Sequence, residues 1–91
     1  MIRLNCFIKV TADKKGIVLE AAKRLTEASV LQEGCKGYDI FESATRPDVM
    51  MICETWADDK ALDAHSNSEV FVKEVAIMKE NSEMYLERFE F

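Results

Sequence analysis

The feature of this sequence that most constrains its fold is a strict alternation of side-chain character at its start. Every second residue from 2 to 10 is apolar, and these residues are Ile2, Leu4, Cys6, Ile8 and Val10. The residues between them are Arg3, Asn5, Phe7 and Lys9. Because successive side chains of a β-strand point to opposite sides, the pattern predicts a strand with one buried face. The apolar set is expected to lie under helices.

The periodicity then changes to that of an amphipathic helix. Its apolar stripe consists of Val18, Ala21, Ala22, Leu25 and Ala28, which recur three and four positions apart. Thr11 or Asp13 is placed to cap the start of this helix. Gly34 is placed to end it in a left-handed cap.

The rest of the chain predicts a hairpin, a broken helix and a last strand. Residues 35–42 and 49–56 are predicted strands, joined by a turn that contains the only proline, Pro47. Asp58 is expected to cap a short helix that ends near His65, and residues 66–68 separate it from a further helix with inward-facing Phe71, Val75 and Met78. Residues 83–91 form the fourth strand. The order predicts one α+β domain over residues 1–91, a ferredoxin-like βαββαβ antiparallel sheet with helices on one face.

Charge and cysteine content limit the partners and the compartment. The formal net charge is −5, and no basic run exceeds a pair of residues. A nucleic acid or an anionic membrane surface is therefore not an expected partner. Polar residues interrupt the apolar N-terminus, which argues against a secretory signal. The odd number of cysteines, 3, predicts free thiols and a cytoplasmic protein.

Strand parity predicts which side chains face away from the helices. Arg3, Asn5, Phe7 and Lys9 belong to this open face. A carboxylate is costly to bury without a partner, which predicts that Glu54, and with it Ile52 and Trp56, also lies there as a cross-strand partner of Arg3. Tyr85, Glu87 and Phe89 are assigned to the open face, as are Asp39 and Phe41, whereas Tyr38, Ile40, Cys6 and Cys53 are expected under the helices. So many exposed aromatic rings predict a dimer interface together with a ligand pocket.

One segment carries a family resemblance. Residues 54–71 read Glu54-Thr55-Trp56, a short acidic spacer, Ala61-Leu62-Asp63-Ala64-His65, then a serine-containing turn and Phe71. This arrangement resembles the antibiotic biosynthesis monooxygenase family, and Glu33-Gly34-Cys35 followed by Tyr38 resembles the start of that family's second strand, without its usual proline. The resemblance implies a homodimer whose sheets form an α/β barrel. It also implies one of several activities: metal- and flavin-free oxidation of quinols or anthrone-like compounds, haem degradation, or isomerisation.

The haem-degrading branch fits poorly. Its members use an asparagine on the first strand, which Asn5 matches. In this sequence, however, His65 stands at the position of their tryptophan, and Val75 stands at the position of the haem-ligating histidine. Haem ligation of that kind is therefore not expected, and the sequence contains no motif for another cofactor. The expected cofactor is none, and no metal site is predicted.

The candidate site residues follow from chemistry and from this resemblance. An ordinary imidazole pKa near 6.5 suits His65 as a base that deprotonates a phenol, although a helix-end histidine is an equal alternative. Asn5 is a candidate to hold a substrate oxygen, and Trp56 a candidate wall that excludes water; each has a purely structural alternative. The predicted substrate-binding residues are Phe7, Phe41, Glu54, Phe71 and Tyr85.

The predicted function is a cofactor-independent monooxygenase that oxidises a small electron-rich aromatic compound with O2. Two alternatives remain open at this point. One is a non-catalytic dimeric module that binds a small molecule or serves in a stress response. The other is a proton-transfer isomerase that works through His65.

Overall fold

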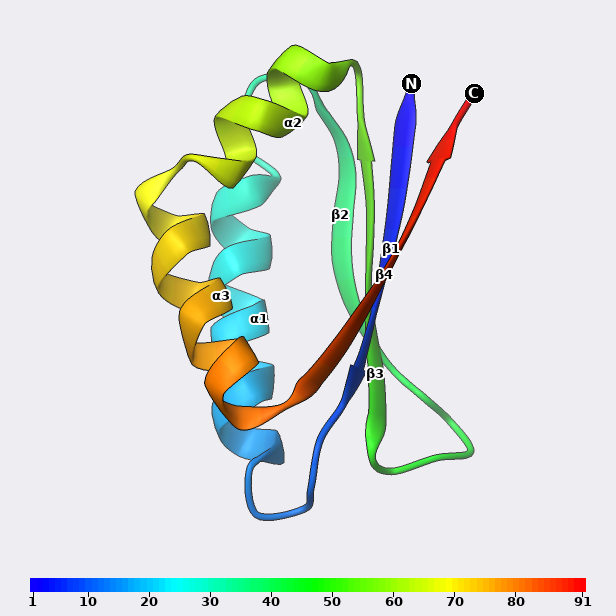
Figure 1. The fold of residues 1–91 in the computed structure, drawn as a ribbon, viewed down its shortest axis with the longest axis vertical. Coiled ribbons are helices and arrows are strands. Elements are labelled where there is room, and N and C mark those ends of the chain that lie inside the picture. Colours follow the sequence, from blue (N-terminus) through cyan, green and yellow to red (C-terminus); the bar gives the residue numbers. More distant parts are fainter.

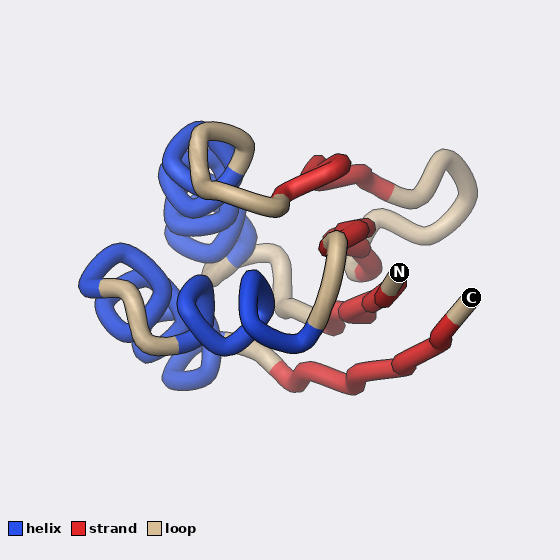
Figure 2. Tube along the Cα trace, turned by 90° about the horizontal axis from the view of Figure 1, so that it is seen from above, coloured by secondary structure: helices blue, strands red, loops and turns tan.

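The computed structural model describes all 91 residues and contains one four-stranded antiparallel sheet covered by helices on one side (Figures 1 and 2). The sheet order is β2-β3-β1-β4. The elements, in chain order, are β1 (Ile2–Lys9), α1 (Lys15–Ser29), β2 (Cys35–Glu42), β3 (Val49–Trp56), α2 (Asp59–Ser66), α3 (Glu69–Asn81) and β4 (Glu83–Glu90). The predicted ferredoxin-like α+β order, with its second helix broken, is confirmed. No helix has the length and apolar character needed to cross a bilayer.

The core lies between the helices and the apolar face of β1. Ile2, Leu4, Cys6 and Ile8 are all buried. Opposite them on β3 lie Trp56, Glu54, Ile52 and Met50, in that order. Directly opposed residues of an antiparallel pair project to the same side of the sheet. These β3 residues therefore also lie under the helices.

The predicted placement of Ile52, Glu54 and Trp56 on the open face is consequently wrong. Glu54 and Trp56 are 6% and 0% exposed. The cost of burying Glu54 is offset because the Trp56 indole Nε1 donates a hydrogen bond of 2.9 Å to Glu54 Oε1. The prediction assumed that the carboxyl would have no partner on the helix side, whereas its partner Trp56 lies there, two residues along the same strand.

Because neighbouring residues of a strand face opposite sides, Cys53 lies on the open face. The prediction that it lies under the helices is therefore also wrong. There it donates to Asn5 Oδ1 at 3.1 Å and accepts from Arg3 Nη1 at 3.2 Å. Arg3 Nε donates to Thr55 Oγ1 at 2.8 Å. The expected Arg3–Glu54 pair is therefore absent, because the two side chains lie on opposite faces of the sheet. Cys6 is buried under the helices, as predicted.

The caps agree with the sequence only in part. Asp58 accepts from the Ala61 backbone at 2.9 Å and begins α2 as predicted. Neither Thr11 nor Asp13 caps α1, because their side chains bond to each other and the helix begins after Lys14. Gly34 does have a left-handed φ of 81°, but α1 already ends at Ser29. Gly34 instead belongs to the turn that leads into β2.

The open face carries exposed aromatic side chains from the outer strands. Phe41 of β2 and Tyr85 and Phe89 of β4 are 50%, 65% and 51% exposed. The rings of Phe7 and Tyr85 pack with their centroids 6.2 Å apart. These four placements match the sequence-based assignment.

Substitution of Gly34 tests the packing of α2 against the turn before β2. A Cβ on Gly34 would collide with Ala61 Cβ of α2, and the positive φ is itself unfavourable for any other residue. We expect Gly34→Ala to lower the free energy of unfolding by about 2–4 kcal/mol. Gly16→Ala in α1 is the matched control, because its Cβ meets nothing within 4 Å, and it should raise stability by about 0.5–1 kcal/mol. Equal urea midpoints for the two variants would contradict this account.

Candidate functional site

A cavity of about 480 Å³ lies between the helix side of the sheet and helices α2 and α3. Its walls are mainly apolar, formed by residues that include Leu4, Cys6, Ile52, Leu62, Phe71 and Val75. Glu54 and His65 also line it and are buried. Leu86 and Lys79, which are exposed, line it from β4 and α3. The cavity therefore has a closed polar end and an opening beside β4, and its size suits a small ligand.

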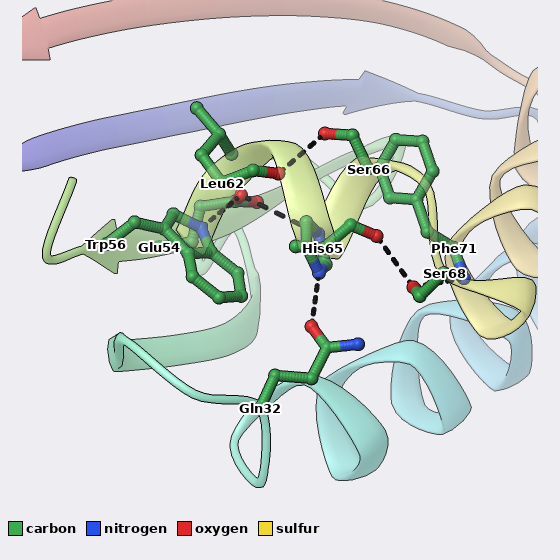
Figure 3. A network of polar contacts seen from close by, with 8 residues as sticks. All are labelled: Gln32, Glu54, Trp56, Leu62, His65, Ser66, Ser68 and Phe71. Carbon is green, nitrogen blue, oxygen red and sulfur yellow. Dashed lines mark hydrogen bonds and ion pairs between the residues drawn. The ribbon is translucent and has the colours of Figure 1, made fainter. Parts of the chain in front are cut away.

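His65 is held in an aromatic cage. It lies on the buried face of α2, one turn after Leu62. The Trp56 ring packs on the imidazole with centroids 4.4 Å apart, and Phe71 meets it edge-on at 5.0 Å. Tyr38 lies 5.5 Å away on a further side. Figure 3 shows the imidazole between Trp56, Glu54 and Phe71, with Gln32 reaching it from the turn that follows α1.

Only one of the two imidazole nitrogens has a hydrogen-bond partner. Nδ1 lies 2.7 Å from Gln32 Oε1, whereas Nε2 is buried and has none. Nε2 lies 4.0 Å from Glu54 Oε1, which is too far for a hydrogen bond. Burial lowers the pKa of His65 to about 4. The ring is therefore neutral at physiological pH.

The pKa of Glu54 is shifted in the opposite direction to that of His65. Burial raises the pKa of this carboxyl to about 7, although the bond from the Trp56 indole opposes the shift. Burial also raises the pKa of Tyr38, and the nearby Glu54 charge adds to that effect. Carboxyl and imidazole thus form an adjacent buried pair in which the carboxyl changes its charge near neutral pH. Groups with such pKa values are suited to proton transfer.

The structure brings together half of the predicted site residues. Four of them, His65, Trp56, Glu54 and Phe71, lie together on the helix side of the sheet (Figure 3). His65, Glu54 and Phe71 line the cavity, whereas Trp56 contacts His65 and Glu54 without lining it. The other four are Asn5, Phe7, Phe41 and Tyr85, which project from the opposite face of the sheet. The sheet itself separates the two groups.

Sequence reasoning did not identify Gln32 or Tyr38 as site residues. Tyr38 was correctly assigned to the helix side, but its position directly opposite Glu54 emerges only from the structure, because the sequence analysis placed Glu54 on the other face. Gln32 gave no usable signal, since it lies in an irregular turn 33 residues before its partner His65. No three His, Cys, Asp or Glu side chains lie close enough together to hold a metal ion.

The chain belongs to the antibiotic biosynthesis monooxygenase family, whose model matches residues 1–77. The resemblance inferred from residues 54–71 is thereby confirmed. The protein named "Putative monooxygenase YcnE" of Bacillus subtilis is 34% identical over 80 residues, which cover 88% of this chain and 84% of that protein.

Solved structures share the whole fold. A Bacteroides thetaiotaomicron protein of unknown function, described as a "Possible Oxidoreductase", is 50% identical with a TM-score of 0.97, and the match covers 99% of this chain and 96% of that one. An antibiotic biosynthesis monooxygenase, 22% identical, superposes with a TM-score of 0.91 over 100% of this chain and 98% of that one. The similarity to this second structure, at 22% identity, shows a shared fold alone.

The buried pair predicts a characteristic dependence of stability on pH. Between about pH 4 and 6.5 the unfolded state protonates His65 and the folded state does not, so this group makes stability rise with pH. Between about pH 4.5 and 7 the unfolded state ionises Glu54 while the folded state keeps it protonated, so Glu54 makes stability fall as pH rises. In the wild type these two contributions oppose each other.

Single variants should separate the two contributions. Relative to wild type, we expect Glu54→Gln to become more stable as pH rises from 4 to 6.5, because the His65 contribution is then unopposed. His65→Gln should lose stability between pH 4.5 and 7. Each difference should be on the order of 3 kcal/mol. Urea unfolding at fixed protein concentration measures it, and two variants with the wild-type pH slope would refute the assignment.

Proposed function

We propose that this protein is a cofactor-independent monooxygenase that oxidises a small, electron-rich aromatic compound, quinol- or anthrone-like, with O2. The observation that carries the proposal is the Glu54–His65 pair, 4.0 Å apart, at the closed end of an apolar cavity. Family membership supports oxidation as the reaction class. The apolar walls, which include Leu62 and Phe71, suit an aromatic ring.

In this proposal the pair removes a proton from a substrate hydroxyl. The neutral imidazole of His65 accepts the proton at Nε2, and the Glu54 carboxylate stabilises the resulting imidazolium. The anionic ring then transfers electrons to O2. One oxygen atom bonds to a ring carbon, and the other leaves as water with the hydrogens that the substrate loses. The ring supplies the electrons, so the balance requires no further reductant.

We also propose that a second copy of the chain covers the open face of the sheet. The exposed rings of Phe41, Tyr85 and Phe89 form an apolar surface of the kind that marks an interface. Asn5, Phe7, Phe41 and Tyr85 would then face the partner subunit, which is a structural role different from the direct substrate contact predicted from the sequence. Three free thiols are consistent with a proposed cytoplasmic location.

A non-catalytic binding module is the second candidate. The lowered pKa of His65 favours it, because an imidazole with a pKa of about 4 is a weak base. Such a module would bind the same aromatic compounds without consuming O2. An isomerase would transfer protons without consuming O2 but would convert its ligand. Oxygen-electrode measurements with a panel of substituted hydroquinones therefore distinguish the oxygenase from both.

His65→Ala should lower kcat about 10²- to 10⁴-fold with a smaller change in KM, because the lost interaction acts in the transition state. Lys60→Ala is the control, an exposed change on the same helix.

The wild-type rate should rise with pH through about 7, because Glu54 must ionise to stabilise the imidazolium, and Glu54→Gln should abolish that rise. An imidazole with the ordinary pKa near 6.5, which the sequence analysis assumed for His65, would instead give a rise centred on that value. Wild-type kcat in His65→Ala would remove His65 from the mechanism.

The dimer can be tested with two variants of similar exposure. Tyr85 lies on the open face of the sheet and Val72 on α3, and they are 65% and 60% exposed. We expect the wild type to be a dimer at micromolar concentration by light scattering. Tyr85→Asp should weaken dimerisation at least about ten-fold, since it places a charge in the interface, whereas Val72→Asp should remain dimeric. A monomeric wild type would contradict the proposal.

A further inference from the structure

Gln32 connects the turn after α1 to the site on α2. Its backbone is held on both sides: its N–H donates to Ser29 O at 3.0 Å, and its carbonyl accepts from the Cys35 N–H at 3.2 Å. From this anchored position its carboxamide oxygen meets His65 Nδ1 at 2.7 Å. The contact is drawn in Figure 3, where Gln32 approaches the imidazole from the side away from Glu54.

This contact determines which nitrogen of His65 carries the proton. A carboxamide oxygen only accepts hydrogen bonds, so a neutral imidazole in this position must donate from Nδ1. Nε2 is then left with a lone pair and no hydrogen. Nε2 therefore has no hydrogen-bond partner because no donor lies within reach of its lone pair.

The aromatic cage fixes the direction of that lone pair. Trp56 covers one face of the imidazole at 4.4 Å, tilted by 34°, and Phe71 stands edge-on at 5.0 Å. Rotating the ring about its Cβ–Cγ bond would put Cδ2 in the place of Nδ1, which would break the bond to Gln32 and push the ring against these neighbours. Nε2 therefore stays on the side of Glu54, at the closed end of the cavity.

We infer that Gln32 is a positioning residue that presents His65 Nε2 as a hydrogen-bond acceptor, and that the closed end of the cavity therefore selects a ligand with a hydroxyl group. The inference rests on the site of the proposed function and specifies its ligand class, an aromatic compound with a free hydroxyl group rather than the corresponding ether. An ether oxygen at this point would face the lone pair and leave Nε2 unpaired. A hydroxyl supplies the missing donor.

The tautomer is measurable without any activity. In protein labelled with ¹⁵N-histidine, NMR should show the proton of His65 on Nδ1. Gln32→Leu should produce a mixture of tautomers, because the acceptor is lost, and Gln32→Glu should restore the Nδ1–H form, because a carboxylate also accepts. Glu33→Gln, an exposed change at the next residue, is the control and should leave the spectrum unchanged. A wild-type His65 with its proton on Nε2 would overturn the inference.

Ligand selectivity is the second measurement. We would compare 2-naphthol with 2-methoxynaphthalene, which share a ring system and differ in that a methyl group replaces the hydroxyl hydrogen. Wild type should bind 2-naphthol at least roughly ten-fold more tightly by calorimetry, and Gln32→Leu should lose most of this preference while Gln32→Glu keeps it. Equal affinities in the wild type overturn the proposal even if Gln32→Leu fails to fold. If 2-naphthol is preferred but no hydroquinone is oxidised, the proposed oxygenase function fails and this inference stands.

Discussion

The antiparallel register between β1 and β3 is the constraint on which the site depends. The apolar face of β1 must be covered by helices, and opposed residues share a face, so Ile2 and Leu4 commit Trp56 and Glu54 to the interior. A carboxyl that would otherwise remain in water is thereby placed beside the imidazole of α2. The perturbed acid–base pair is a direct consequence of covering an aliphatic strand.

Much of the fold was predictable because it rests on local periodicity. The strands 35–42 and 49–56 match the observed bounds, and the break between α2 and α3 falls at the predicted serine-rich segment. The face assignment of β3 failed for a specific reason. On this strand Met51, Cys53 and Thr55 alternate with Met50, Ile52 and Glu54, so neither set is clearly polar and one glutamate decided the prediction. The burial of the apolar residues on β1, which lie opposite this face of β3, decides its orientation despite the cost of burying that single carboxyl.

The site was less predictable than the fold because its contacts join distant segments. His65 and Trp56 are conspicuous in the sequence as the only histidine and the only tryptophan. Their environment is not conspicuous, because Gln32 reaches His65 from an irregular turn and no pattern marks it. The pKa of about 4 for His65 is likewise a property of the packed cage. Sequence reasoning could only assume the ordinary value for an imidazole.

The close approach at Gly34 has a consequence for how molecules exchange with the interior. With no side chain at Gly34, Ala61 of α2 packs directly on the turn before β2, and Gly34 O accepts a 2.8 Å bond from the Ala57 backbone. The turn before β2 and the start of α2 are consequently in direct contact through backbone and a single methyl group. β4, by contrast, is an edge strand, and its Leu86 is 57% exposed at the cavity wall. We expect the rate of ligand exchange to follow the local fraying of β4, while the pair behind α2 keeps its geometry.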